Sequence, residues 1–214
     1  MSGPATGPVL VCFAVPEEAA PFLKGLPPGV EVIVSGMGGA AAERAVKPKL
    51  AERKWRLVLT CGFAGGLSPD LPAEKVVFDA DEGFPLRQAL TYAGAVPARF
   101  HCAGRVAVTA QEKAALREST GTEVVEMESG VIRRLCRERG VPSATVRVIS
   151  DTAYEDLPLD FNTLMQDDGR LNLVRLALAV LSRPQKIPAL MALGRRSKAA
   201  AARLSSVLEA ILRA

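Results

Sequence analysis

The chain has 214 residues, 49% of them hydrophobic and 23% charged, and a net charge of +4. This length and balance fit one domain spanning residues 1–214 with a sizeable core, and they exclude a disordered chain. Four scattered cysteines and a single histidine exclude the usual zinc-binding patterns, so we expect neither a metal nor a disulfide bond. Residues 1–8 lack the order of a signal peptide, and no apolar run approaches the ~18 residues of a membrane span, so we expect a cytoplasmic protein.

The first part of the chain alternates strands and helices. Three apolar, β-branched runs predict buried strands, at residues 8–15, 30–36 and 56–67. Helices are predicted after the first two of them, at residues 16–26 and 38–54. Pro48 could disturb the second helix, and Cys12 and Cys61 should be buried because they lie inside apolar runs. The alternation predicts an α/β fold with a mixed, mostly parallel sheet flanked by helices.

The remaining elements are predicted in the same way. Strands are expected at residues 75–82, 99–109, 122–127 and 143–150, and helices at 110–120 and 128–139, the last closed by Gly140. The tail, residues 157–214, carries nine Lys and Arg against four Asp and Glu. It reads as two or three helices, at 171–182, 186–193 and 197–213, which we expect to pack on the α/β body.

Acidic side chains gather where the predicted strands end. Glu17 and Glu18 follow the first strand, Glu126 and Glu128 flank the end of a later one, and Asp151 follows the last. Ligands of open α/β sheets bind beyond the carboxyl ends of the parallel strands, so these residues could meet at one site. Either Glu17 or Glu18 could face it, because neighbouring residues at a helix start differ in direction by about 100°.

These residues also have ordinary structural explanations. Asp151 could cap the loop after its strand, and Glu128 could be a first-turn carboxylate favoured by the helix dipole. Arg147 lies inside an apolar strand, so it should have an acidic partner if that strand is buried. His101 has no partner motif and is expected to be structural.

A weaker motif points to another class of enzyme. Residues 36–41, "GMGGAA", fit the G-x-G-x-x-A pattern of dinucleotide-binding folds. That pattern also needs an acidic residue about twenty positions on, where this chain has Thr60 and Cys61. Small residues that pack a helix on the sheet explain Gly36 and Gly38 equally well, so a nicotinamide-linked enzyme is disfavoured.

Five motifs in this order resemble one family across residues 8–156: "AVPEE", "SGMGGAAAE", "TCGFAGGL", "VEMESG" and "VRVISDTAYED". The family is the nucleoside phosphorylase and nucleosidase superfamily, which includes the 5'-methylthioadenosine/S-adenosylhomocysteine nucleosidases. The continuation, "DLPLDFNTLMQDDGRL" and "IPALMALGRRSKAAAARL", looks most like the hopanoid-biosynthesis branch, whose members are thought to release adenine from adenosylhopane. The resemblance implies a purine nucleosidase without a cofactor. A purine nucleoside phosphorylase, a methylthioadenosine/S-adenosylhomocysteine nucleosidase and a non-catalytic nucleoside-binding protein are the alternatives.

The resemblance also implies roles for individual residues. Glu128 would bind the ribose hydroxyls, with Met127 packed against the sugar. Asp151 would be the general acid at the purine N7, and Glu18 would orient the attacking water, with Glu17 in reserve. The other residues implied around the substrate are Glu126, Phe63, Ala64, Gly65 and Ser150.

Two departures from the family pattern bear on the reaction. Phe63 stands where the nucleosidases have a small hydroxyl residue, so the ribose contacts there must differ. Thr60 stands where the bacterial phosphorylases have a phosphate-binding arginine, which favours hydrolysis, although Arg44 or a neighbouring subunit could supply the cation.

The basic, apolar composition of the tail suits a helix on an anionic membrane or a lipid-linked substrate, with Arg195, Arg196 and Lys198 as candidate contacts. The alternatives are packing within the chain and a dimer interface. We expect a homo-oligomer that binds a small purine nucleoside and no nucleic acid.

Overall fold

The computed structural model describes residues 7–166 and 168–213, so the signal-peptide expectation lies largely outside the described residues. The strands are β1 (Val9–Phe13), β2 (Val30–Val34), β3 (Leu57–Gly66), β4 (Val76–Ala80), β5 (Val96–Pro97), β6 (Phe100–Cys102), β7 (Val124–Glu126) and β8 (Ser143–Asp151). The α-helices are α1 (Pro16–Leu23), α2 (Gly39–Ala51), α3 (Arg87–Tyr92), α4 (Ala110–Thr120), α5 (Ser129–Glu138), α6 (Leu173–Ser182) and α7 (Ile187–Leu212). Two short 3-10 helices are η1 (Phe161–Thr163) and η2 (Pro184–Lys186).

The strands of the described chain form one mixed, mostly parallel sheet with helices on its faces, which confirms the predicted fold class. The strand order is β2-β1-β3-β8-β4-β5. β1 is parallel to β2 and β3, and β3 is parallel to β8, whereas β4 runs antiparallel to β8. Because β1, β3 and β8 are parallel neighbours, their carboxyl ends meet at one edge of the sheet.

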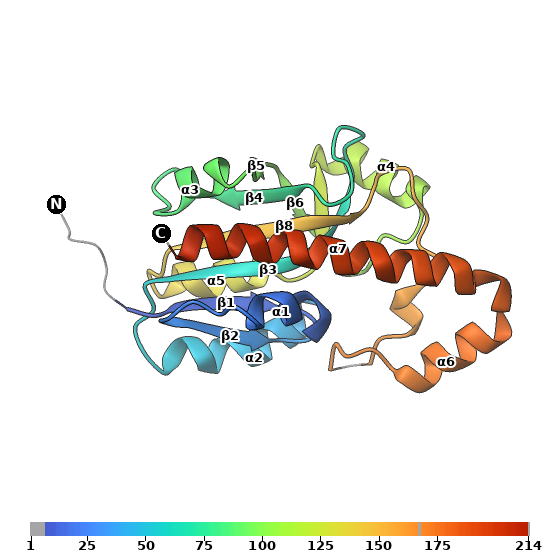
Figure 1. The fold of residues 1–214 in the computed structure, drawn as a ribbon, viewed down its shortest axis with the longest axis horizontal. Helices are drawn as coiled ribbons and strands as arrows, with labels where there is room; N and C mark the ends of the chain where they lie inside the picture. Colours follow the sequence, from blue (N-terminus) through green and yellow to red (C-terminus); the bar gives the residue numbers. More distant parts are fainter. Residues whose placement is uncertain (1–6, 167, 214) are drawn as a thin grey trace.

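Two apolar layers hold the helices on the sheet. One face carries α1 and α7, where Phe13 and Leu59 of the strands pack with Phe22, Leu204 and Leu208. The other face carries α2 and α5, with a second core that includes Leu10, Val46, Val58, Ile132 and Leu135. Figure 1 shows α7 lying along the strands beside α1. The end of α7 is therefore packed on the sheet. Cys12 and Cys61 are buried as predicted.

Three details of the predicted elements are wrong. Residues 99–109 form a strand only at Phe100–Cys102, because the side-chain amide of Asn162 bonds both the N–H and the C=O of Val106 in place of a neighbouring strand. The short elements α3 and β5 were not predicted. The two helices expected at 186–193 and 197–213 are one continuous helix. Pro48 lies inside α2, which continues to Ala51.

A helical arm extends beyond the sheet. α6 and the first part of α7 project past the strand ends (Figure 1). Leu173, Val174, Leu178 and Leu181 of α6 and Met191 of α7 are all exposed large hydrophobic side chains. None of the helices in the described residues is both long and apolar enough to span a membrane.

Candidate active site

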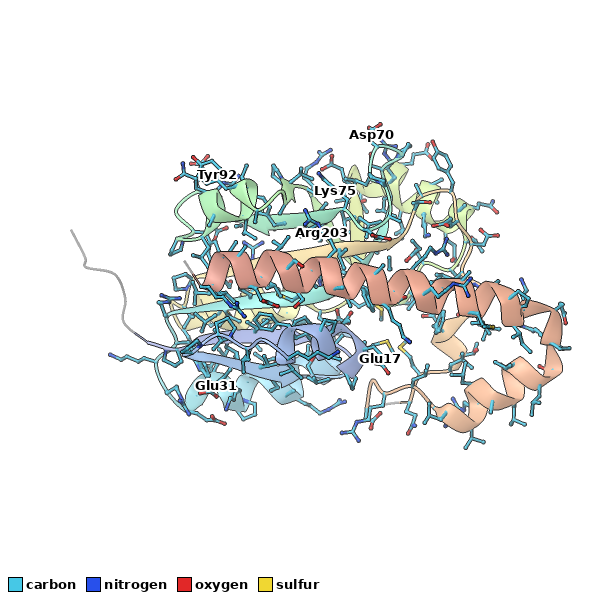
Figure 2. All side chains as sticks on the ribbon, in the orientation of Figure 1. Glu17, Glu31, Asp70, Lys75, Tyr92 and Arg203 are labelled. Carbon is cyan, nitrogen blue, oxygen red and sulfur yellow. The ribbon has the colours of Figure 1, made fainter. Side chains whose placement is uncertain are left out.

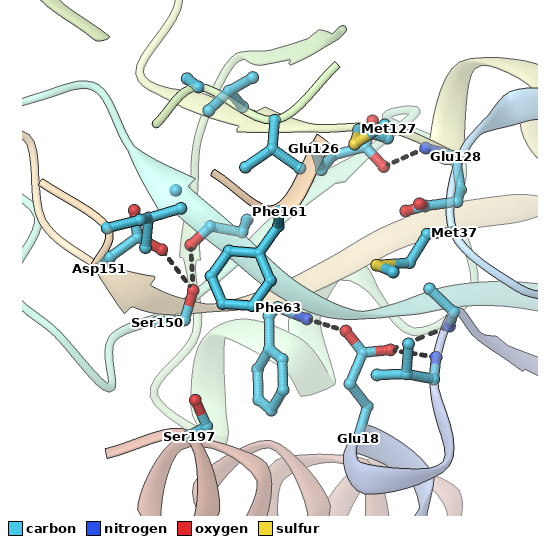
Figure 3. A pocket seen from close by; sticks show the side chains of 18 of the residues that line it. Glu18, Met37, Phe63, Glu126, Met127, Glu128, Ser150, Asp151, Phe161 and Ser197 are labelled. Atoms are coloured by element: carbon cyan, nitrogen blue, oxygen red, sulfur yellow. Dashed lines mark hydrogen bonds between the residues drawn. The ribbon is translucent and has the colours of Figure 1, made fainter. Parts of the chain in front are cut away.

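A cavity of about 270 Å³ lies where β1, β3 and β8 end. All nine site residues expected from the sequence line it: Glu18, Phe63, Ala64, Gly65, Glu126, Met127, Glu128, Ser150 and Asp151. Figure 3 shows Asp151 and Ser150 at one end of the cavity, and Glu18, Met37 and Glu128 at the other. The fold thus brings together residues that are up to 133 positions apart in the sequence, from Glu18 to Asp151.

Glu18, rather than Glu17, faces the cavity. Glu18 is 4% exposed, whereas Glu17 is exposed on the surface (Figure 2). One carboxylate oxygen of Glu18 accepts hydrogen bonds from the N–H groups of Ala14 and Val15, at 2.9 and 3.1 Å, and the other accepts one from Phe63 at 2.7 Å. Burial raises the pKa of Glu18 to about 7, against the opposing effects of Arg147 and the Phe63 N–H. Glu18 can therefore gain and lose a proton near neutral pH.

Gly62 makes room for this arrangement. A β-carbon at Gly62 would lie 2.5 Å from Oε1 of Glu18 and 2.7 Å from Nη1 of Arg147. Its φ of +142° is also a conformation that other residues rarely adopt. The glycine in "CGFAGG" thus lets a carboxylate and a guanidinium approach the backbone of β3.

Arg147 is a buried cation that is bonded to carboxyl groups of the cavity wall. Its side chain is 1% exposed, and Nη2 donates to Glu126 at 2.6 Å and to Glu128 at 3.0 Å. Burial works against the charge of Arg147, but Glu126, Glu128 and Glu18 hold its pKa above its ordinary value. The prediction that Arg147 has an acidic partner is confirmed.

Glu126 and Glu128 are held differently. The Glu126 carboxylate accepts from the N–H groups of Glu128 and Ser129, from the Ser129 hydroxyl and from Arg147. Burial opposes ionisation of Glu126, yet Arg147 and these donors hold its pKa below the ordinary value, so Glu126 is an anion that fixes the start of α5. Glu128 has fewer donors: Oε1 accepts from the Gly38 N–H at 2.8 Å and Oε2 from Arg147. Burial raises the pKa of Glu128 despite Arg147, and each oxygen keeps a lone pair for a ligand.

The strand β7 reaches this site by a route that the sequence pattern did not predict. We expected Glu126 and Glu128 at the carboxyl end of a strand parallel to its neighbours. Instead, β7 is parallel to β6 but antiparallel to β3, where Gly65 pairs with Val125. It therefore enters beyond the end of β3 and runs back along it, which carries Met127 and Glu128 to the cavity.

Asp151 is 6% exposed at the end of β8. Its Oδ1 accepts a hydrogen bond of 2.6 Å from the Ser150 hydroxyl, and its Oδ2 lies 2.5 Å from Nζ of Lys113. Sequence reasoning missed Lys113, because a lysine in a charged helix is normally taken as a surface residue. Its spacing of three residues from both Ala110 and Leu116 was the available signal, since these positions share one face of α4.

The far wall of the cavity comes from the tail. Leu157 and Phe161 follow β8, and Leu193 and Ser197 belong to α7. Phe63 lines the same cavity, and Figure 3 shows Phe161 above Phe63 in this view, with Ser197 on the helix below them. The sequence pattern did not identify these residues. The wall next to the helical arm is therefore largely apolar.

Other residues singled out from the sequence lie elsewhere. Thr60 is buried outside the cavity lining, and its hydroxyl accepts from Arg147. The N–H of Gly38 bonds Glu128 in place of a phosphate group, and His101 lies on β6 away from the cavity lining. Within the described residues, no group of three His, Cys, Asp or Glu side chains is arranged to hold a metal ion.

The described fold and site define a nucleoside phosphorylase-like α/β architecture, and comparisons with solved structures agree. The structure is similar to a 5'-methylthioadenosine/S-adenosylhomocysteine nucleosidase from Neisseria meningitidis in complex with methylthio-immucillin-A, with 18% identity, a TM-score of 0.71 and coverage of 97% of this chain and 99% of that one. The corresponding nucleosidase from Colwellia psychrerythraea in complex with adenine gives 18% identity, a TM-score of 0.70 and coverage of 98% and 96%. A futalosine hydrolase mutant from Helicobacter pylori gives 16% identity and a TM-score of 0.65, with coverage of 95% of this chain and 99% of that one.

A comparison with family models points the same way. Residues 81–182, which run from the end of β4 to the end of α6, match the model described as "Phosphorylase superfamily". The TM-scores of 0.65–0.71 establish a shared fold. At identities of 16–18% the activity has to be argued from the site itself.

Proposed function

We propose that the protein is a purine nucleosidase that hydrolyses the N-glycosidic bond of an adenosine derivative and releases adenine. The observation that carries this proposal is the pair of buried carboxyl groups, Glu18 and Asp151, at opposite ends of one cavity, with Glu128 at the same end as Glu18. In the proposed reaction, Glu128 binds the ribose hydroxyls and Met127 packs on the sugar. Asp151 supplies a proton to N7 of the leaving base, and Glu18 accepts one from the attacking water.

The proton balance fits these residues. As the bond from C1' to the base breaks, its electron pair leaves with the base, and a proton at N7 lets the base depart as a neutral molecule. The water oxygen bonds to C1', and its proton passes to Glu18. Since the pKa of Glu18 is about 7, its carboxylate can accept that proton at neutral pH and return it to solvent afterwards.

The charge of the cavity favours water over phosphate as the nucleophile. Among the described residues that line it, four carry carboxyl groups, and Arg105 is the single basic one. Arg105 is 64% exposed in its side chain and is already paired with Glu112 at 2.7 Å. An anionic phosphate would therefore find no unpaired cation among the described lining residues, which supports hydrolysis.

We further propose a lipid-linked substrate, adenosylhopane. The tail motifs resemble the hopanoid branch. The cavity wall formed by Phe63, Phe161 and Leu193 is apolar and suits an apolar 5' substituent. The small hydroxyl residue that the nucleosidases have in place of Phe63 would suit such a substituent less well. The exposed apolar side chains of α6 support peripheral contact between the arm and a membrane, or an interface within a homo-oligomer. A methylthioadenosine/S-adenosylhomocysteine nucleosidase is the second candidate, and the similarity to the Neisseria structure favours it.

Adenine release tests these proposals. Methylthioadenosine and a 5'-alkyl or hopanoid-linked adenosine should each be assayed with and without phosphate. Adenine release in the absence of phosphate from the lipid-like nucleoside, but not from methylthioadenosine, supports the hopanoid substrate. Adenine release from methylthioadenosine supports the second candidate. Binding without any release would indicate a nucleoside-binding protein. Asp151→Asn should lower the rate by about 10²–10⁴-fold, whereas Asp70→Asn, in an exposed loop, should not.

The membrane contact needs a separate measurement. Arg196 is paired with Glu155 in the structure, so its replacement would also disturb the loop after β8. Arg195 and Lys198 are exposed, and Leu178 lies on the outer face of α6. Reversing the charge of Arg195 and Lys198, together with Leu178→Glu, should abolish binding to anionic liposomes. Unchanged liposome binding would reject the membrane contact.

A further inference from the structure

Lys113 of α4 is completely buried, which is rare for a lysine. Its Nζ lies 2.5 Å from Oδ2 of Asp151, and it donates to the carbonyl oxygens of Thr152 and Glu155, both at 2.8 Å. An ammonium group has three N–H donors, so these three acceptors use all of them. Lys113 therefore fixes both the Asp151 carboxyl and the loop that follows it.

The same three partners also suit the neutral amine. An amine has two N–H groups, which can keep bonding the carbonyls of Thr152 and Glu155, and a lone pair, which can accept the O–H of a protonated Asp151. A proton can therefore pass between Nζ and the carboxyl without the loss of a hydrogen bond. Because the pair is buried, an unmade hydrogen bond would be costly, so this equivalence lowers the cost of the transfer.

The charged groups on the neighbouring elements are bonded elsewhere. They are Glu112 with Arg105 beside α4, Asp156 with the N–H of Ala110, Glu155 with Arg196 of α7, Glu126 and Glu128 with Arg147, and Glu18 with the N–H groups of Ala14, Val15 and Phe63. Lys113 is thus the cation that is paired with Asp151.

We propose that Lys113 is a positioning residue that holds Asp151 toward the cavity and supplies the proton that Asp151 gives to the leaving base. This inference rests on the proposed nucleosidase function. In each turnover the ammonium transfers one proton to the carboxylate, the carboxyl transfers it to N7 as the glycosidic bond breaks, and the amine is reprotonated from solvent. No other reactant is required.

The two possible roles of Lys113 differ in their dependence on pH. Lysine ammonium groups hold their proton to above about pH 9, whereas an isolated carboxyl loses its proton near about pH 4. If Lys113 supplies the proton, its removal should leave activity only at acidic pH, where Asp151 can be protonated directly. If Lys113 only supports the loop, its removal should lower activity by the same factor at every pH.

The test compares kcat for adenine release by the wild type, Lys113→Met and the control Lys47→Met, an exposed lysine on α2, at pH 5.5 and 8.5. We expect Lys113→Met to lose at least about 100-fold at pH 8.5 and less than about tenfold at pH 5.5, and the control to match the wild type. Equal losses at both pH values, or no loss, would overturn the proposal. If Lys113→Met does not fold, Lys113→Gln keeps amide donors for the carbonyls without the charge, and the same criteria apply.

If the wild type releases no base, the proposed nucleosidase function is rejected. The pairing of Lys113 with Asp151 can then be tested by an independent measurement. The ¹³C signal of the Asp151 carboxyl, followed against pH in both proteins, provides it. A titration that moves to higher pH in Lys113→Met supports the pairing, and identical titrations overturn it.

Discussion

The burial of Glu18 predicts that the protein loses stability as the pH rises from about 4.5 to about 7. In this window the folded protein holds the Glu18 proton, and the unfolded chain, with the ordinary pKa of 4.5, has released it. The folded state therefore binds more protons, so rising pH favours unfolding. The contribution of this group is complete below pH 4.5 and is lost above pH 7. Glu18→Gln removes the ionisation and should remove this pH dependence.

The size of the effect follows from the two pKa values. At about 1.4 kcal/mol for each pH unit between them, the full contribution is about 3 kcal/mol. Most of this contribution is lost between pH 5 and pH 8. Glutamine cannot accept all three backbone hydrogen bonds of Glu18, which shifts stability by a constant amount. The quantity to measure is therefore the change with pH, rather than the stability at a single pH.

Urea unfolding of the wild type and Glu18→Gln at pH 5, 6.5 and 8 gives this quantity, since other titrating groups cancel in the difference between the two proteins. We expect the variant to gain about 2–3 kcal/mol relative to the wild type between pH 5 and pH 8. Glu17→Gln, the same change at the exposed neighbour, should show no comparable gain. A difference between Glu18→Gln and the wild type that does not change with pH would refute the reasoning.

Three further results are expected. If Glu18 accepts the proton of the attacking water, kcat/KM for adenine release should fall below about pH 7, and a flat acid limb in the pH profile would contradict that role. Gly62→Ala should lower the melting temperature and abolish most adenine release, because its β-carbon would meet Glu18 and Arg147. The control is Gly29→Ala, where φ is also positive but no atom lies within 4 Å, and it should keep full activity. Equal activities of the two variants would argue against this contact. Arg147→Met leaves Glu126 and Glu128 buried without their cation and should cost about 3–5 kcal/mol in urea unfolding, with partial recovery at low pH; an unchanged midpoint would mean that the ion pairs contribute little.

Local patterns predicted most of the α/β framework. The apolar runs that became β1, β2, β3 and β8 are β-branched and short, and helical spacing with Gly140 marked α5 and its end. The pattern failed at residues 99–109, because a side chain from residue 162 takes the backbone hydrogen bonds of Val106. Residues 194–196 lie between two predicted helices, yet α7 runs through them, since Ala200, Leu204 and Leu208 bury the following turns on the sheet. At such positions tertiary packing outweighs the intrinsic helix or strand propensity of the residues.

The sequence by itself determined which residues are candidates for the site. Acidic side chains directly after apolar strands indicate a binding site, and the motifs that resemble the family contain the same residues. The sequence could not decide between Glu17 and Glu18, because only the packing of α1 against β3 buries one of them beside the Phe63 N–H. Nor could it show that Lys113 meets Asp151, since that contact joins residues 38 positions apart on different elements. The protonation of Glu18 was equally hidden, because a pKa depends on burial and on neighbouring charges, and both are set by the tertiary structure.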